Sequence, residues 1–95
     1  MHVIIRHGDQ VRTKHRRDWR GRLPNESYTD KDFPANTIFT VRFGKDPHYI
    51  AGVAFLATPD GWEGIWNSVD ESTNTSYLDD WDFEVITHAI ICEND

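Results

Sequence analysis

Residues 36–67 contain the pattern that most limits how this chain can fold. Large apolar side chains alternate with polar ones along 36–43, which is the period of a strand with one buried face. Residues 48–57 are apolar on both faces, as in a central strand, and 62–67 form a third extended run. Turn sequences separate these runs at 44–47 and 58–61, the second with Pro and Gly where a type I turn favours them. We therefore expect a three-stranded antiparallel meander.

Two shorter extended runs precede the meander. Residues 2–6 and 10–13 contain several β-branched side chains, which favour strands. Gly8-Asp9 lies between them and is a hairpin signal, so we expect the two runs to pair. The alternative is a helix from Asp9 to Gly21, with Asp9 as its N-cap.

The other segments are less regular. Gly, Pro, Asn, Ser and Asp interrupt 16–35 without a sustained period, so we expect a loop there. Residues 69–74 are expected to form a second loop, 76–81 one helical turn, and 83–91 the last strand. These assignments predict a mainly β protein: a small antiparallel roll or open barrel of five to six short strands, with at most one or two helical turns.

Length and cysteine content limit the class of protein. Ninety-five residues correspond to a single small β domain spanning 1–95. The single cysteine, Cys92, cannot form an internal disulfide, and we expect it to be a half-buried thiol in the last strand of a protein from a reducing compartment such as the cytoplasm. No apolar run approaches the roughly 20 residues that span a bilayer, so we expect no membrane partner.

Charge is distributed unevenly along the chain. The whole sequence has a net charge of −6, from ten Lys and Arg and sixteen acids. Residues 1–24 contain seven of these basic residues and two acids, a net +5, which leaves −11 for residues 25–95. This asymmetry indicates either a charged partner or neutralisation of the two parts within one fold.

One short motif resembles an enzyme family. Arg6-His7-Gly8 follows a strand, and in this it resembles the start of the histidine phosphatases, whose histidine is the phosphorylated nucleophile. Those enzymes have a larger α/β domain, with a second arginine and a second histidine on later strands. This chain lacks the alternating helices of such a domain, and its later His48 and His88 lie in no matching motif. No other catalytic, cofactor or metal-binding motif occurs. We therefore expect no enzymatic activity, no catalytic residues, no cofactor and no metal site.

Two segments are candidates for binding. The first is the basic loop or arm at 12–22, which could neutralise phosphates while its tryptophan stacks on a base. Its candidate nucleic-acid-binding residues are Arg12, Lys14, Arg16, Arg17, Trp19, Arg20 and Arg22. The second segment combines aromatic and acidic side chains, the composition of a protein-binding hot spot for a basic partner. Its candidate residues are Trp62, Trp66, Tyr77, Asp79, Asp80, Trp81 and Asp82, although the tryptophans could instead form the core.

The middle and end of the chain resemble small, β-rich accessory proteins of bacteriophages, especially phages of actinobacteria. The similar segments are Pro34-Ala35-Asn36-Thr37-Ile38-Phe39, Asp60-Gly61-Trp62, Tyr77-Leu78 and Phe83-Glu84-Val85-Ile86. The resemblance implies a non-catalytic protein in the host cytoplasm that binds a host or phage macromolecule. We expect the acidic, aromatic surface to dock on a basic host protein and inhibit or redirect it. The alternative is a nucleic-acid-binding module that uses 12–22.

Overall fold

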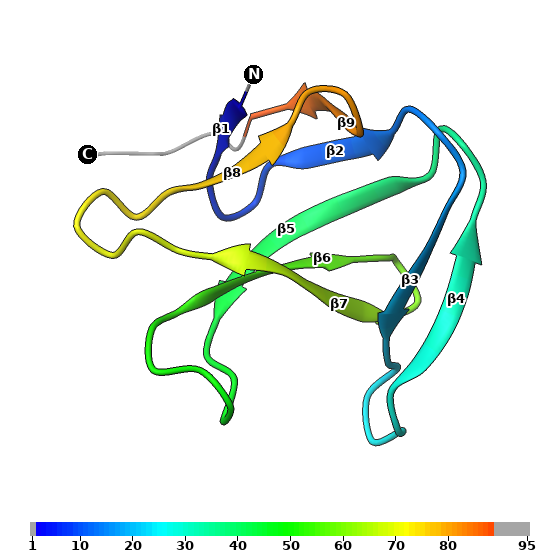
Figure 1. Ribbon diagram of the computed structural model, residues 1–95, viewed down its shortest axis with the longest axis horizontal. Coiled ribbons are helices and arrows are strands. Elements are labelled where there is room, and N and C mark those ends of the chain that lie inside the picture. Colours follow the sequence, from blue (N-terminus) through cyan, green and yellow to red (C-terminus); the bar gives the residue numbers. More distant parts are fainter. Residues whose placement is uncertain (1, 89–95) are drawn as a thin grey trace.

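The computed structural model describes residues 2–88, which form nine strands and no helix (Figure 1). No described segment is therefore a helix that could cross a membrane. The predictions for Cys92 and for the end of the last strand fall outside the described residues. The strands are β1 (His2–Ile5), β2 (Gln10–Thr13), β3 (Arg17–Gly21), β4 (Thr29–Phe33), β5 (Ile38–Gly44), β6 (Val53–Ala57), β7 (Glu63–Ser68), β8 (Ser76–Asp79) and β9 (Phe83–Thr87).

The predicted meander forms one end of the main sheet. This antiparallel sheet has the order β7-β6-β5-β2-β9, so the meander forms three of its five strands. The turn between β6 and β7 closes with a hydrogen bond of 3.0 Å from the Gly61 N–H to the Thr58 carbonyl. Gly61 has a φ of +98°, a conformation that glycine adopts at no steric cost. The central strand begins only at Val53, because residues 45–52 form a longer loop than predicted.

The first two strands are correctly predicted, but their pairing is not. The chain does bend at Gly8-Asp9, where the Asp9 N–H donates to the Arg6 carbonyl at 3.1 Å. After the bend the strands separate: β1 pairs with β8 in a two-stranded sheet, whereas β2 lies between β5 and β9. The alternative helix over 9–21 is also absent. The helical turn predicted at 76–81 is wrong as well, because Ser76–Asp79 is the strand that pairs with β1.

The predicted loop over 16–35 contains an antiparallel hairpin, formed by β3 and β4. The basic segment therefore lies largely in β2 and β3 rather than in a loop or arm. The sequence signal for the β3–β4 hairpin is weak. Four of the five residues of β4 are exposed, so the strand shows little alternation of apolar and polar side chains. In β3 the less exposed positions are Arg17, Trp19 and Gly21, which do not form an apolar series.

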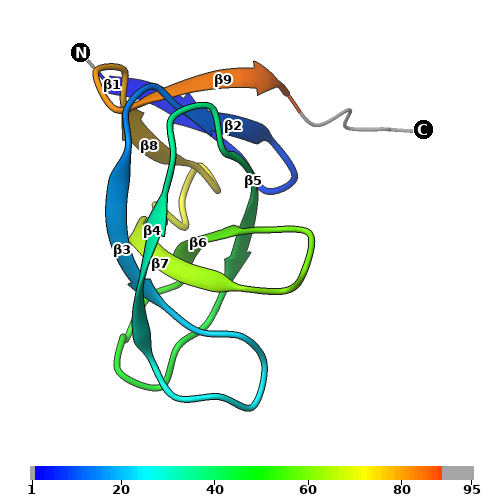
Figure 2. The ribbon, with the colours of Figure 1, turned by 90° about the vertical axis from the view of Figure 1, so that its right-hand side faces the viewer.

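The hairpin of β3 and β4 stands beside β7, on the right of Figure 1 and in front in Figure 2. One antiparallel bridge joins Arg22 to Glu63, and two glycines allow the hairpin to approach β7 closely. A side chain at Gly21 would overlap Trp62 and the Glu63 backbone. A Cβ at Gly64 would lie 2.8 Å from both the Trp19 and the Trp62 indoles.

The main sheet curls around one hydrophobic core. Trp66 of β7 and Phe83 of β9 come from opposite edge strands, yet their rings lie 4.8 Å apart. The fully buried side chains of this core include Val11, Phe39 and Leu56. Leu78 of β8, in the β1–β8 sheet, packs in the same core. The sheet stays open, because no strand ladder joins β7 to β9 in the described part of the chain. The predicted class, a small mainly β fold, is confirmed.

Candidate protein-binding surface

The structure divides the predicted aromatic residues into core and surface. Trp62 is only 2% exposed, and Trp66 is partly buried against the same cluster. Both rings contact Trp19, with centroids 5.4 and 5.6 Å away. Trp62 and Trp66 therefore share a face, and that face is the core. Trp62 is therefore a core residue, and Trp66 is partly covered by the β3–β4 hairpin, so neither is an exposed aromatic side chain of the kind the sequence suggested.

The remaining predicted residues lie in β8 and in the turn after it. Ser76 and Leu78 point into the protein, so Tyr77 and Asp79 alternate with them on the outer face. Trp81, in the turn, is 69% exposed, the largest exposed fraction of the described tryptophans, and Tyr77 is 40% exposed. We call Ile4, Tyr77, Asp79, Asp80, Trp81 and Asp82 the acidic aromatic surface.

The turn that carries Trp81 is held by hydrogen bonds from two directions. The Trp81 N–H donates to Asp79 Oδ1 at 2.9 Å, and the Asp82 N–H donates to the Asp79 carbonyl at 3.1 Å. From the residue that follows β2, the Lys14 N–H donates to the Asp82 carbonyl at 2.9 Å. The His15 ring lies 5.3 Å from that of Trp81. These contacts order the turn before any partner arrives, which lowers the entropic cost of binding.

β1 contributes Ile4 and His2, which were not among the residues predicted from the sequence. Ile4 lies opposite Tyr77 in the ladder between β1 and β8, and it is 50% exposed. His2 stacks on the Tyr77 ring, with centroids 4.3 Å apart and planes 4° apart. No local sequence signal could have identified these residues, because the pairing that places them joins opposite ends of the chain.

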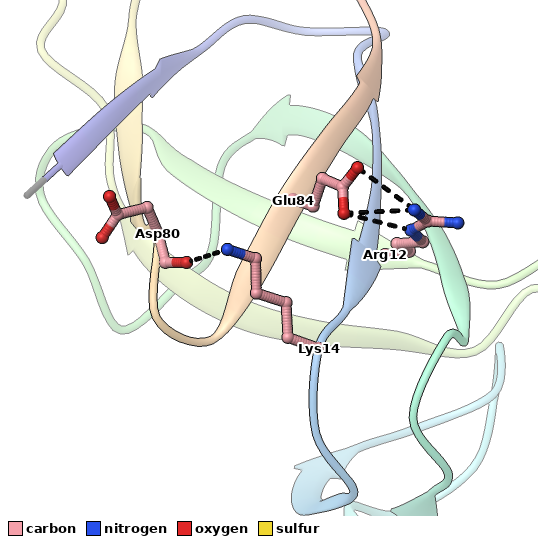
Figure 3. A network of polar contacts seen from close by, with 4 residues as sticks. All are labelled: Arg12, Lys14, Asp80 and Glu84. Atoms are coloured by element: carbon pink, nitrogen blue, oxygen red, sulfur yellow. Dashed lines mark hydrogen bonds and ion pairs between the residues drawn. The ribbon is translucent and has the colours of Figure 1, made fainter.

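The basic segment makes intramolecular contacts along most of its length. Figure 3 shows two of them: Arg12 binds both carboxylate oxygens of Glu84 at 3.1 Å, and the Lys14 ammonium donates to the Asp80 carbonyl. Arg16 pairs with Asp32, which lowers the pKa of that carboxyl, and Arg20 lies 3.5 Å from Asp30. Arg22 has no carboxylate partner in the described region, but its guanidinium lies over Tyr28.

Arg17 is part of the packing around the core. Its guanidinium carbon lies 5.8, 5.1 and 5.4 Å from the ring centroids of Trp19, Trp66 and Phe83, respectively. It also approaches Asp82 at 4.0 Å, and 30% of its side chain is exposed. Arg17 and Trp19 therefore stabilise the fold, since their positions are fixed by these rings. Together, the seven predicted nucleic-acid-binding residues do not form one unpaired basic surface.

Several hollows lie outside the core, and two of them are beside exposed tyrosines. One, of about 270 Å³, is beside Tyr77 and Ile4, between the β1–β8 sheet and the loop before β8. The other, of about 380 Å³, lies between the β3–β4 hairpin and the β5–β6 loop and is lined by Tyr28 and Tyr49 among others. Asp46 lines the second hollow, where it accepts the His48 N–H at 2.9 Å. Neither hollow was predicted, because each forms between segments that are distant in the sequence.

The histidine of the phosphatase-like motif has a structural contact. His7 Nδ1 accepts the Phe43 N–H at 3.0 Å, and its ring packs edge-on against that of Phe43. Nearby, the buried Asp9 carboxylate lies 3.2 Å from His88 Nδ1 and accepts the Arg6 N–H. Within residues 2–88, no three His, Cys, Asp or Glu side chains gather as metal ligands would. The absence of enzymatic activity stays a prediction.

Comparisons with protein-family models, curated proteins and solved structures found no match for this chain. The resemblance to phage accessory proteins is therefore untested and stays a prediction.

Proposed function

We propose that this chain is a non-catalytic binding module that docks its acidic aromatic surface on a basic surface of another protein. The observation that carries the proposal is Trp81, an indole that is 69% exposed on a turn ordered by hydrogen bonds. Exposing so much apolar surface is unfavourable in water, and tryptophan is enriched at the centres of protein interfaces. An ordered, exposed tryptophan is therefore well suited to be the anchor of an interface.

The surrounding charges favour a basic partner. Asp80 and Asp82 flank Trp81 directly and Asp79 lies two residues before it, within a region of the sequence that has an excess of acids. Carboxylates around an aromatic anchor increase the association rate with a positively charged surface and disfavour acidic partners. The same charges would repel the phosphates of a nucleic acid. Intramolecular pairing of Arg12, Arg16 and Arg20 also favours a protein partner over the nucleic-acid alternative.

The resemblance to phage accessory proteins extends this proposal to the source of the partner. It favours a host or phage protein in the host cytoplasm, whose activity the chain inhibits or redirects on binding. That part of the proposal depends on the resemblance, whereas the choice of surface depends on the geometry of β1, β8 and the turn after β8.

Affinity capture from host lysate, with and without nuclease, tests the proposal. We expect a protein to be retained in both conditions by the wild type, and to be lost with Trp81→Ala. Tyr49→Ala is the matched control, because Tyr49 is a 50% exposed aromatic residue on the distant β5–β6 loop (Figure 1). Replacing Asp79, Asp80 and Asp82 with Asn keeps their hydrogen-bond acceptors while removing charge, and should weaken capture and its salt dependence.

Two results would contradict the proposal. If Trp81→Ala retains the same protein as the wild type, the surface is not the interface. If nuclease abolishes capture, nucleic acid is the partner, and a gel shift lost on replacing Arg16, Arg17 and Arg20 with Ala would then support the alternative.

A further inference from the structure

The hollow beside Tyr77 belongs to the same face as the proposed docking surface. Ile4 and Tyr77 form one wall, and Val69, Asp70, Thr75 and Ser76 contribute to the remainder of the lining. The hollow measures about 270 Å³ and is open to solvent at its mouth. A partner that covers Tyr77 and Ile4 would therefore also cover this hollow and would need to fill it.

The walls of the hollow are fixed by main-chain and side-chain hydrogen bonds. The Asp70 N–H donates to the Thr75 carbonyl at 2.8 Å, and the Asn74 N–H donates to the Asp70 carbonyl at 2.7 Å. On the other side, the Ser76 hydroxyl donates to the Ser68 carbonyl at 2.9 Å. The shape of the hollow thus exists before binding, as is usual for a specific pocket.

The hollow is lined by apolar side chains and by one acidic residue, Asp70. Ile4 and Tyr77 are 50% and 40% exposed and provide the apolar contact. Asp70 accepts hydrogen bonds from the Ser72 hydroxyl at 2.6 Å and the Ser72 N–H at 3.0 Å. These bonds lower the pKa of Asp70, so its carboxylate is ionised at neutral pH.

Asp70 differs from its neighbour Glu71 in its partners. Glu71 lies 2.9 Å from the Lys45 ammonium, whereas no cationic side chain in the described region pairs with Asp70. A negative charge without a cationic partner, at the edge of an apolar hollow, complements a side chain with an aliphatic stem and a cationic end. Arginine meets both requirements, because its stem packs on apolar surface and its flat guanidinium stacks on aromatic rings and binds carboxylates.

We propose that this hollow binds one arginine side chain of the protein partner, with the stem against Ile4 and Tyr77 and the guanidinium on Asp70. This inference rests on the proposed function and specifies part of what the docking surface recognises. Lysine has a similar stem but lacks the planar guanidinium, so it should bind more weakly at the same position.

NMR titration of the ¹⁵N-labelled protein tests the proposal with three blocked tripeptides, acetyl-Ala-X-Ala-amide, in which X is arginine, lysine or citrulline. We expect the arginine peptide to shift the amide signals of Asp70, Thr75, Ser76 and Tyr77 saturably, with a dissociation constant in the millimolar range. The lysine peptide should bind several-fold more weakly. The citrulline peptide, which has the same length without the charge, should cause no saturable shift.

Two substitutions and a control locate the binding. Asp70→Asn retains an acceptor for Ser72 and should reduce the affinity for the arginine peptide at least tenfold. Ile4→Ala removes an exposed part of the wall and should reduce it several-fold. Glu71→Gln, the matched control, removes an equal charge from the next residue, which does not line the hollow, and should leave the affinity unchanged. The ¹⁵N spectrum of each variant reports whether it remains folded.

Failure of this inference can be separated from failure of the proposed function. Equal binding of the arginine and citrulline peptides, or unchanged binding by Asp70→Asn, overturns the arginine site. If that occurs while Trp81→Ala still abolishes capture, the docking surface stands without the arginine site. If the arginine peptide binds at Asp70 while Trp81→Ala captures normally, the docking surface around Trp81 is wrong.

Discussion

Replacing Gly64 with alanine should destabilise the protein, although a Gly→Ala substitution often increases stability at sites whose backbone conformation suits alanine. The φ of Gly64 lies outside the left-handed region, so alanine fits its backbone, and the lost freedom of the unfolded chain alone would stabilise the fold by about 0.4–1 kcal/mol. The new Cβ, however, would lie 2.8 Å from Trp19 Cε2 and 2.8 Å from Trp62 Cη2. Overpacking against such rings costs about 1–3 kcal/mol, so the net effect should be destabilising.

Gly52 provides the matched control for this substitution. A methyl group added at Gly52 would have the Gly44 carbonyl oxygen as its nearest neighbour, at 3.4 Å, which is close to ordinary van der Waals contact. Gly52→Ala should therefore be neutral or slightly stabilising.

Thermal and urea unfolding of both variants provide the test. For a domain of this size, each kcal/mol shifts the melting temperature by about 4–8 °C. We expect Gly64→Ala to melt several degrees below the wild type and Gly52→Ala to melt at or above it. If Gly64→Ala equals or exceeds the wild type in stability, Trp19 does not lie over β7 as described, and the hairpin is not packed on the core.

Two further predictions concern charged residues. Arg17→Met keeps the aliphatic stem but removes the guanidinium from three aromatic rings, and should lower the free energy of unfolding by about 1–2 kcal/mol in urea titrations. The exposed Arg16→Met should change the midpoint little, and equal effects of the two substitutions would contradict the packing role of Arg17. The second concerns Glu71, whose pKa is lowered by Lys45 and by the Gly52 N–H. A folded-state pKa below the unfolded value gives stability that is present at neutral pH and is lost as pH falls through about 5 and below. Glu71→Gln should therefore reduce the decrease in urea midpoint between pH 7 and pH 3, and an unchanged decrease would exclude this contribution.

The sequence patterns that depend only on neighbouring residues, strand alternation and turn sequences, predicted the structure most accurately. Strands that have one face in the core and one in solvent, such as β5, show the alternation directly. The turn before β7 is held by a hydrogen bond between Gly61 and Thr58, which are neighbours in the chain. The sequence of residues 58–61 was therefore sufficient to predict this turn. β4 was missed because an edge strand with few buried side chains has no such alternation.

The candidate surface was predicted only in part. Tyr77, Asp79 and Trp81 were identified from composition, and they do lie on the outer part of β8 and the turn that follows. Trp62 and Trp66 also lie among acidic residues in the sequence, but Trp19 of the β3–β4 hairpin packs on both of them, so Trp62 is buried and Trp66 is partly buried. Ile4 was missed because its exposure beside Tyr77 depends on the pairing of β1 with β8.

The sequence by itself determined the mainly β class, the three-stranded meander and the division of charge along the chain. Each of these depends on residues close together in the chain or on simple counts. Only the tertiary structure decided which tryptophan remains exposed, which arginines are paired, and that β1 joins β8. The physical reason is that backbone hydrogen bonds can join any two strands, and burial depends on which distant segments then pack together.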